Sequence, residues 1–98
     1  MSRKEGSILI VDDNKDLLIA LRLILSRSFE TIHTLKNPNL ILSTLEQRSY
    51  DIILLDMNFK AGQNSGNEGI FWMNKILEGD PEATVVFITA FGDVELAI

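Results

Sequence analysis

The sequence predicts a single α/β domain in which helices cover both faces of a parallel sheet. Two observations lead to this fold class. Residues 8–11 and 52–55 are aliphatic throughout, and a strand without alternating polar residues is typically buried on both faces, as in parallel sheets. Between and after these runs, apolar residues recur at helical spacing, so that strands and helices alternate along the chain.

The expected order of elements is β-α-β-α-β-α-β. We predict strands at residues 7–11, 31–35, 51–56 and 83–89, and helices at 14–27, 37–48 and 70–80, with one more helix beginning at 92–93. Asp12 to Asn14 offer N-cap side chains for the first helix, and Asn37, with Pro38 suited to a first helical turn, begins the second. Pro81 ends the third helix. The stretch 59–69 is rich in Gly and Asn and is therefore a loop.

The helical spacing also predicts which helix residues face the core. In the first helix the apolar face consists of Leu17, Leu18, Leu21, Ile24 and Leu25, and in the third helix of Ile70, Met73, Ile76 and Leu77. His33 is expected to be a partly exposed strand residue and not a reactive group.

Carboxylates follow two of the buried strands. Asp12 and Asp13 come directly after the first strand, and Asp56 ends the strand at 51–56. In open parallel sheets ligands gather at the carboxyl ends of the strands, so these side chains are expected to meet at one rim. Like charges this close repel unless a cation lies among them, which predicts a site for a hard divalent ion such as Mg²⁺.

Composition limits the functions that the chain can have. Its 98 residues allow one domain, residues 1–98, with 46% hydrophobic and 23% charged residues, as in folded globular proteins. A net charge of −5 argues against direct nucleic-acid binding, because phosphate backbones attract basic surfaces. The lack of cysteine excludes thiol catalysis. The sequence shows neither a signal peptide nor a membrane span, so we expect a cytoplasmic protein.

Three segments together resemble the receiver domains of two-component response regulators. They are residues 8–14, 52–57 and 86–90, each at a strand end and in the family's order. The run from Thr89 to Glu95 resembles the NtrC-type subgroup, whose receivers control an AAA+ ATPase that activates an alternative sigma factor. The resemblance spans almost the whole chain. It implies a flavodoxin-like (CheY-like), three-layer α/β/α fold with the strand order 2-1-3-4.

The resemblance also implies a role for each site residue. Asp56 is the expected phosphoacceptor, which takes a phosphoryl group from a sensor histidine kinase and is not part of a multiple-turnover enzyme. Asp12, Asp13 or both, with Asp56 and the backbone carbonyl of Asn58, are expected to hold Mg²⁺; which of the pair touches the ion stays open. Thr89 is expected to donate its hydroxyl to a phosphoryl oxygen. The phosphorylated state then switches a transcriptional output of ATPase and DNA-binding domains.

The chain departs from the family pattern at its C-terminal side. The fifth strand and fifth helix are missing, together with the lysine that the family carries at the end of that strand. We therefore expect a receiver domain that is incomplete at the C-terminus. Without its neighbour, the strand at 83–89 is expected to be an exposed apolar edge through which the chain self-associates.

The loop 58–69 is a second departure, because it is longer than usual and carries Lys60 where the family tends to have proline. Lys60 is expected to be a solvated loop lysine. The alternative is that it reaches the phosphoryl group on Asp56 and alters the lifetime of the acyl phosphate.

Two other functions stay open. Phosphohydrolases of the haloacid dehalogenase type also place a nucleophilic Asp after an apolar strand and a Thr or Ser after a later one, as with Asp56 and Thr89. Those enzymes need a second Asp two residues on as general acid, and this chain has Asn58 there. The other alternative is a receiver-like interaction module that is never phosphorylated.

Overall fold

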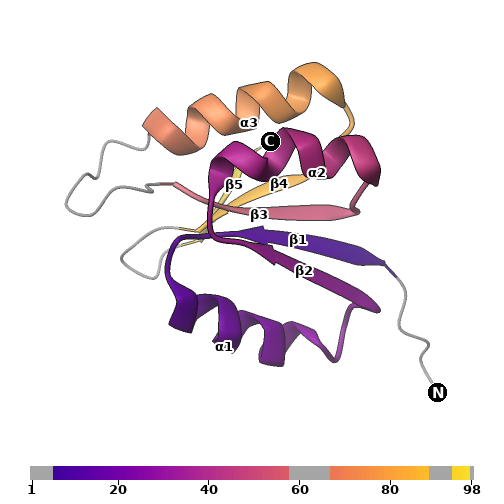
Figure 1. Cartoon of the computed structure of the whole chain (residues 1–98), viewed down its shortest axis with the longest axis vertical. Coiled ribbons are helices and arrows are strands. Elements are labelled where there is room, and N and C mark those ends of the chain that lie inside the picture. The colour runs from indigo at the N-terminus through magenta and orange to yellow at the C-terminus, as the bar shows by residue number, and fades with distance from the viewer. Residues whose placement is uncertain (1–5, 58–66, 89–93, 98) are drawn as a thin grey trace.

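Helices cover both faces of a five-stranded sheet in the computed structural model, which describes residues 6–57, 67–88 and 94–97. The strands are β1 (Ser7–Val11), β2 (Thr31–Leu35), β3 (Ile52–Asp56), β4 (Val85–Ile88) and β5 (Val94–Ala97). The helices are α1 (Lys15–Leu25), α2 (Ile41–Gln47), which follows the 3₁₀ helix η1 (Pro38–Leu40), and α3 (Asn67–Gly79). Figure 1 shows α1 on one face of the sheet and α2 with α3 on the other.

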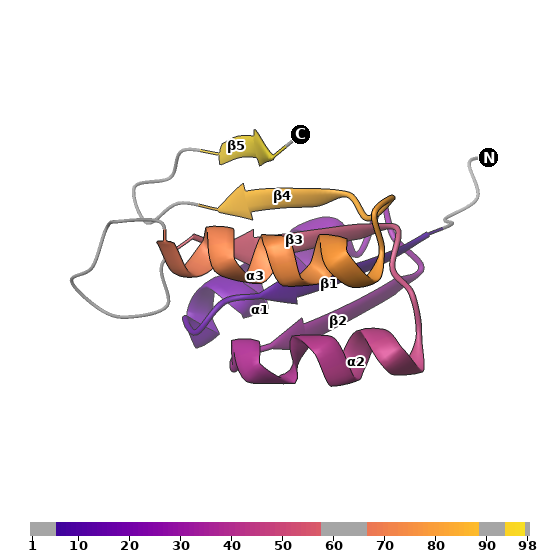
Figure 2. The same ribbon diagram turned by 90° about the horizontal axis from the view of Figure 1, so that it is seen from above.

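The strands β1 to β4 form the predicted parallel sheet, in the order 2-1-3-4 (Figure 2). Ile8 of β1 pairs with Ile32 of β2 on one side and with Ile52 of β3 on the other. At the opposite end of β3, Asp56 pairs with Ile88 of β4. Because these four strands run in the same direction, their carboxyl ends lie at one rim of the sheet.

The chain after β4 forms a strand, so the helix predicted from residues 92–93 is wrong. β5 runs antiparallel to β4, with Ala97 opposite Val85 and Val94 opposite Ile88. The physical reason is that the outer edge of β4 offers N–H and C=O groups that need partners, and β5 supplies them. The prediction that β4 is an exposed edge is therefore also wrong. The predicted self-association rested on that exposed edge, so it now lacks this support and stays a prediction.

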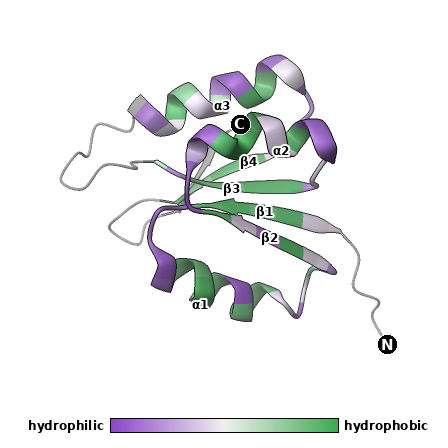
Figure 3. Cartoon of the chain, in the orientation of Figure 1, coloured by the Kyte–Doolittle hydropathy of each residue, from purple (hydrophilic) through white to green (hydrophobic). Residues whose placement is uncertain are grey.

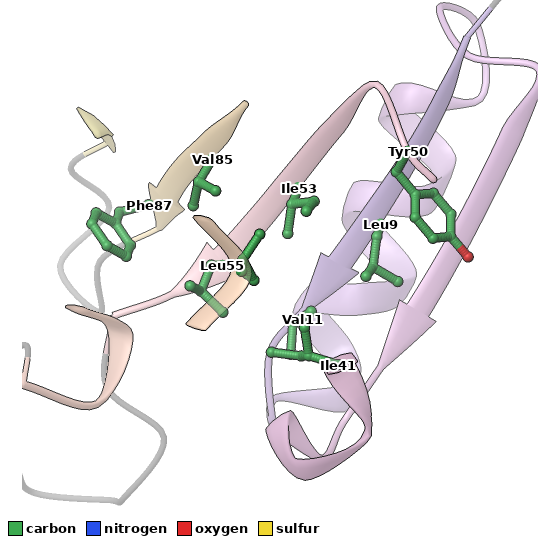
Figure 4. Packing of buried hydrophobic residues seen from close by; sticks show 9 residues of the cluster. Leu9, Val11, Ile41, Tyr50, Ile53, Leu55, Val85 and Phe87 are labelled. Atoms are coloured by element: carbon green, nitrogen blue, oxygen red, sulfur yellow. The ribbon is translucent and has the colours of Figure 1, made fainter. Parts of the chain in front are cut away.

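The core has two layers, one on each face of the sheet. Alternate residues of β1 point to opposite faces, so that Leu9 and Val11 pack with α2 and α3 (Figure 4), and Ile8 and Ile10 pack with α1. All of β1 is buried, as its unbroken apolar run predicts, and this run is visible in Figure 3. Leu54 of β3 is half-buried and packs against the layer that contains Ile8, Ile10 and Leu18.

Two predicted core residues are exposed, Ile24 of α1 and Ile70 of α3. Each lies six residues from a buried residue of the same helix, Leu18 and Ile76 respectively. At about 100° per residue, six residues place a side chain about 120° away from the buried direction. A single sheet face covers only part of a helix circumference, so these two side chains point past it.

The helix boundaries also differ in detail from those predicted. α1 ends at Leu25 instead of residue 27, and α3 begins at Asn67, within the predicted loop. Within the predicted capping segment Asp12 to Asn14, it is Asn14 that caps α1: its side chain accepts a hydrogen bond from the N–H of Leu17. None of the helices in the described part of the chain is long and apolar enough to cross a membrane.

His33 is half-buried in β2, as predicted, and it has a specific partner. Its Nδ1 is hydrogen-bonded to the hydroxyl of Tyr50, and the two rings meet edge to face at 5.5 Å. Burial raises the pKa of Tyr50, whereas the nearby charge of Arg48 lowers it. The pair ties β2 to the segment that enters β3.

Candidate functional site

The structure brings the three predicted carboxylates together at the rim of the sheet. One carboxylate oxygen each of Asp12, Asp13 and Asp56 can be chosen so that all three lie within 4.8 Å of one another. Asp12 is 4% exposed and Asp56 is 6% exposed, whereas Asp13 is open to solvent. Because β1 and β3 are parallel neighbours in the sheet, the residues at their carboxyl ends lie side by side.

Asp12 is held in place from two directions. Its N–H donates to the carbonyl of Leu35 at 3.0 Å, which continues the ladder between β1 and β2. Its carboxylate Oδ1 accepts a hydrogen bond from the N–H of Asn14 at 2.8 Å. Asn14 in turn accepts the N–H of Leu17 at 3.1 Å and begins α1. The acidic rim is thus connected directly to the first turn of α1.

The electrostatics of the site favour a cation. Burial raises the pKa of Asp12, the hydrogen bond from Asn14 opposes this rise, and the charge of Asp13 adds to it. A buried carboxylate beside two others is costly in its charged form unless positive charge is nearby. Carboxylate oxygens are also the ligands that Mg²⁺ prefers, and a set of this size leaves positions for water or substrate oxygens. The donor set therefore fits Mg²⁺.

Gly69 fixes the position of the residue that follows Asp56. Its N–H donates to the carbonyl of Met57 at 2.9 Å, and the N–H of Met57 donates to the carbonyl of Ile88 at 3.0 Å. A Cβ on residue 69 would lie 2.7 Å from the Cα of Met57 and 3.1 Å from Cε1 of Phe87. Only glycine allows α3 to approach this closely. The apolar pattern of the sequence did not single out this glycine, although a Gly at the start of a helical apolar period was a usable signal.

The remaining predicted site residues lie outside the described part of the chain. These are Asn58, Lys60 and Thr89. The residue before Thr89, Ile88, is paired with Asp56 across β3 and β4. The roles of Asn58, Lys60 and Thr89 stay predictions.

An exposed apolar patch lies on α1, the helix that follows the acidic rim. We call it the α1 patch, and it consists of Ile19, Leu23 and Ile24, which are 52%, 69% and 67% exposed. The helical pattern missed Ile19 and Leu23 and placed Ile24 in the core. Large aliphatic side chains exposed this close together are typical of an interaction surface.

Comparison with known families identifies a domain. The family model of the response regulator receiver domain matches residues 8–98. The DNA-binding transcriptional regulator NtrC of Salmonella typhimurium is 25% identical over 95 residues, which are 97% of this chain and 19% of NtrC. The chain thus spans about a fifth of the length of this relative.

Solved structures agree with this result. NtrX from Brucella abortus in complex with ADP superposes with a TM-score of 0.74 at 25% identity, over 93% of this chain and 19% of NtrX. The response regulator TrrA from Thermotoga maritima in complex with Mg²⁺-BeF superposes with a TM-score of 0.73 at 24% identity, over 90% of this chain and 70% of TrrA. At that identity the likeness to TrrA shows the fold alone. This chain belongs to the response regulator receiver domain family, a family of signalling domains, and it resembles the receivers of NtrC-type regulators.

Proposed function

We propose that this chain accepts a phosphoryl group on Asp56 from a histidine of a sensor kinase. The observation that carries the proposal is the convergence of three carboxylate oxygens within 4.8 Å, with Asp56 at the end of a central strand. A carboxylate is a competent phosphoryl nucleophile when the charge of the transferring group is neutralised. In the reaction, the bond between phosphorus and the kinase nitrogen breaks, and a bond from phosphorus to an oxygen of Asp56 forms.

Asp12, Asp13 and Asp56 would hold the magnesium ion, with the backbone carbonyl of Asn58 as a further ligand. When bound, Mg²⁺ offsets the negative charge on the oxygens of the transferring phosphoryl group. Asp12 is kept in position by its bond from the N–H of Asn14. Thr89 would donate a hydrogen bond to a phosphoryl oxygen and so report the phosphorylated state to the segment that follows it.

We propose that the whole gene product is a cytoplasmic transcription regulator with an ATPase domain and a DNA-binding domain. Two relatives support this output. NtrC is by its name a DNA-binding transcriptional regulator, and NtrX was solved with ADP. The matching family is that of receiver domains, which argues against the haloacid dehalogenase alternative. The receiver that is never phosphorylated remains the competing proposal.

Phosphorylation of Asp56 is tested with a small phosphodonor such as acetyl phosphate and Mg²⁺. We expect the whole gene product to gain one phosphoryl mass, sensitive to hydroxylamine as an acyl phosphate is. Asp56→Asn is expected to lose the label completely, since an amide is no nucleophile here. The control, Asp16→Asn, changes an exposed carboxylate of α1 by the same chemistry and keeps the label. An unlabelled wild-type protein would favour the competing proposal, and label on Asp56→Asn would disprove the acceptor assignment.

The α1 patch is proposed to contact the sensor kinase, because it is apolar and exposed and lies on the helix that begins at the acidic rim. We expect Leu23→Glu to slow phosphoryl transfer from the kinase by about tenfold or more, because the kinase would bury this side chain in the complex. Labelling by acetyl phosphate should stay unchanged, since Leu23 is 69% exposed and supports no core contact. Asn74→Glu places the same charge on exposed α3, on the other face of the sheet, and serves as the control. Equal kinase rates for Leu23→Glu and Asn74→Glu would exclude the α1 patch from the interface.

A further inference from the structure

A hollow lies between α2 and α3, at the end of the sheet opposite the acidic rim. Its volume is about 510 Å³, within the range of about 300 to 1,000 Å³ that is usual for small-molecule sites. Ile53, near the start of β3, lies at one side and Ala83, just before β4, at another. The hollow is therefore separate from the carboxylates, which lie at the other ends of the strands.

The floor of the hollow is apolar and belongs to the core. Ile53 and Ile76 are each 1% exposed, and the buried ring of Tyr50 lies beside them. The position of Tyr50 is held by its hydrogen bond to His33. Gly79 lines the hollow, and no atom lies within 4 Å of where its Cβ would stand.

The rim of the hollow is negative. Three acidic residues line it, Glu46, Glu78 and Asp80, together with Lys75, and the guanidinium carbon of Arg48 lies 5.3 Å from the ring centroid of Tyr50. The Oδ1 of Asp80 accepts the N–H of Glu82 at 3.1 Å. The Lys75 Nζ lies 5.7 Å from the ring centroid of Phe71, toward the start of α3, whereas Glu78 and Asp80 lie at its end. The last turn of α3 carries no basic residue, and the carbonyl end of a helix dipole adds further negative potential there. The end of α3 therefore favours a cation.

We propose that this hollow binds a small organic cation, with an apolar ring or short chain on the floor and an ammonium or guanidinium group at the end of α3. The floor accounts for the apolar part of the ligand, and the helix end with Glu78 and Asp80 accounts for the charge. This proposal does not depend on phosphorylation of Asp56.

The proposal is tested by NMR titration of the chain with benzylamine and with benzyl alcohol, which has the same ring and no charge. We expect benzylamine to shift the methyl resonances of Ile53, Ile76 and Ala83 saturably at millimolar concentration, and benzyl alcohol to bind about fivefold more weakly. Glu78 is exposed, so Glu78→Gln should fold normally and weaken benzylamine about threefold without affecting benzyl alcohol.

Glu30→Gln is the matched control. It makes the same change in net charge at an exposed residue that does not line the hollow, and it should bind benzylamine as the wild type does. Equal affinity for the amine and the alcohol would overturn the proposal, as would an equal loss in Glu30→Gln and Glu78→Gln. The absence of saturable shifts at the three methyl groups up to about 20 mM would also overturn it.

Discussion

Gly69→Ala is expected to lower the free energy of unfolding by about 2–3 kcal/mol. The added Cβ would stand 2.7 Å from the Cα and 3.0 Å from the carbonyl oxygen of Met57, both backbone atoms that cannot rotate away. Either α3 or the segment after Asp56 must move, and the hydrogen bond from Gly69 to Met57 must lengthen. Urea denaturation followed by circular dichroism measures this loss. We also expect slower labelling of Asp56, because Met57 follows it directly.

Gly79→Ala is the matched control, since it makes the same substitution at the other end of α3. Here a Cβ meets nothing within 4 Å. The backbone is helical, so alanine should raise the free energy of unfolding by about 0.5 kcal/mol through the smaller entropy of the unfolded chain. The two variants thus change stability in opposite directions. A loss of less than about 0.5 kcal/mol in Gly69→Ala would show that the first turn of α3 adjusts without cost.

Asp12→Asn is expected to stabilise the metal-free chain and to remove its response to magnesium. Asparagine keeps an oxygen that can accept the N–H of Asn14, and it removes a buried negative charge beside Asp13 and Asp56. We expect the free energy of unfolding at pH 7 without metal to rise, because the buried charge is gone. In the wild type, Mg²⁺ at about 100 times its dissociation constant should add about 2.7 kcal/mol. In the variant the same concentration should add little.

The pH dependence of stability gives an independent check on the sign of the change expected for Asp12→Asn. Burial raises the pKa of Asp12 in the folded chain, so the folded state holds its proton to higher pH than the unfolded state does. Stability from this group is therefore fully present below its ordinary pKa of about 4 and is lost as pH rises through the folded value. The gain in the free energy of unfolding of Asp12→Asn should therefore be absent below the ordinary pKa and reach its full size above the folded pKa.

Denaturation curves of wild type, Asp12→Asn and Asp16→Asn, with and without Mg²⁺, measure both effects. Asp16 is exposed on α1 and does not belong to the cluster, so Asp16→Asn should behave as the wild type does. If Asp12→Asn is less stable than the wild type without metal, Asp12 contributes more through its bond to Asn14 than its buried charge costs.

The parallel part of the fold and the acidic rim were predictable from sequence because short sequence patterns determine both. Unbroken aliphatic runs identify β1 and β3, and a carboxylate directly after each run falls at the rim wherever the strands are neighbours and parallel. These patterns do not depend on loop conformation, so Asp12 and Asp56 were identifiable from the residues directly before them.

Other features depend on distances between elements, and no local pattern encodes those. The strand at β5 forms because β4 has an edge to pair with, whereas its own residues were equally readable as a helix start. Gly69 is required only because α3 passes so close to Met57. The hollow is lined by residues of α2 and α3 and by Ile53 and Ala83, which come together only through the packing of these elements.

Asn14 belongs to two structures at once. Its N–H is bonded to the carboxylate of Asp12, and its side chain begins α1, the helix that carries the α1 patch. Asn14 therefore joins the rim, where magnesium would bind, to the helix on which a partner would bind, and thermodynamic reciprocity applies to any coupling that it carries. Whatever factor the ion adds to the partner's affinity, the partner must add to the affinity for the ion.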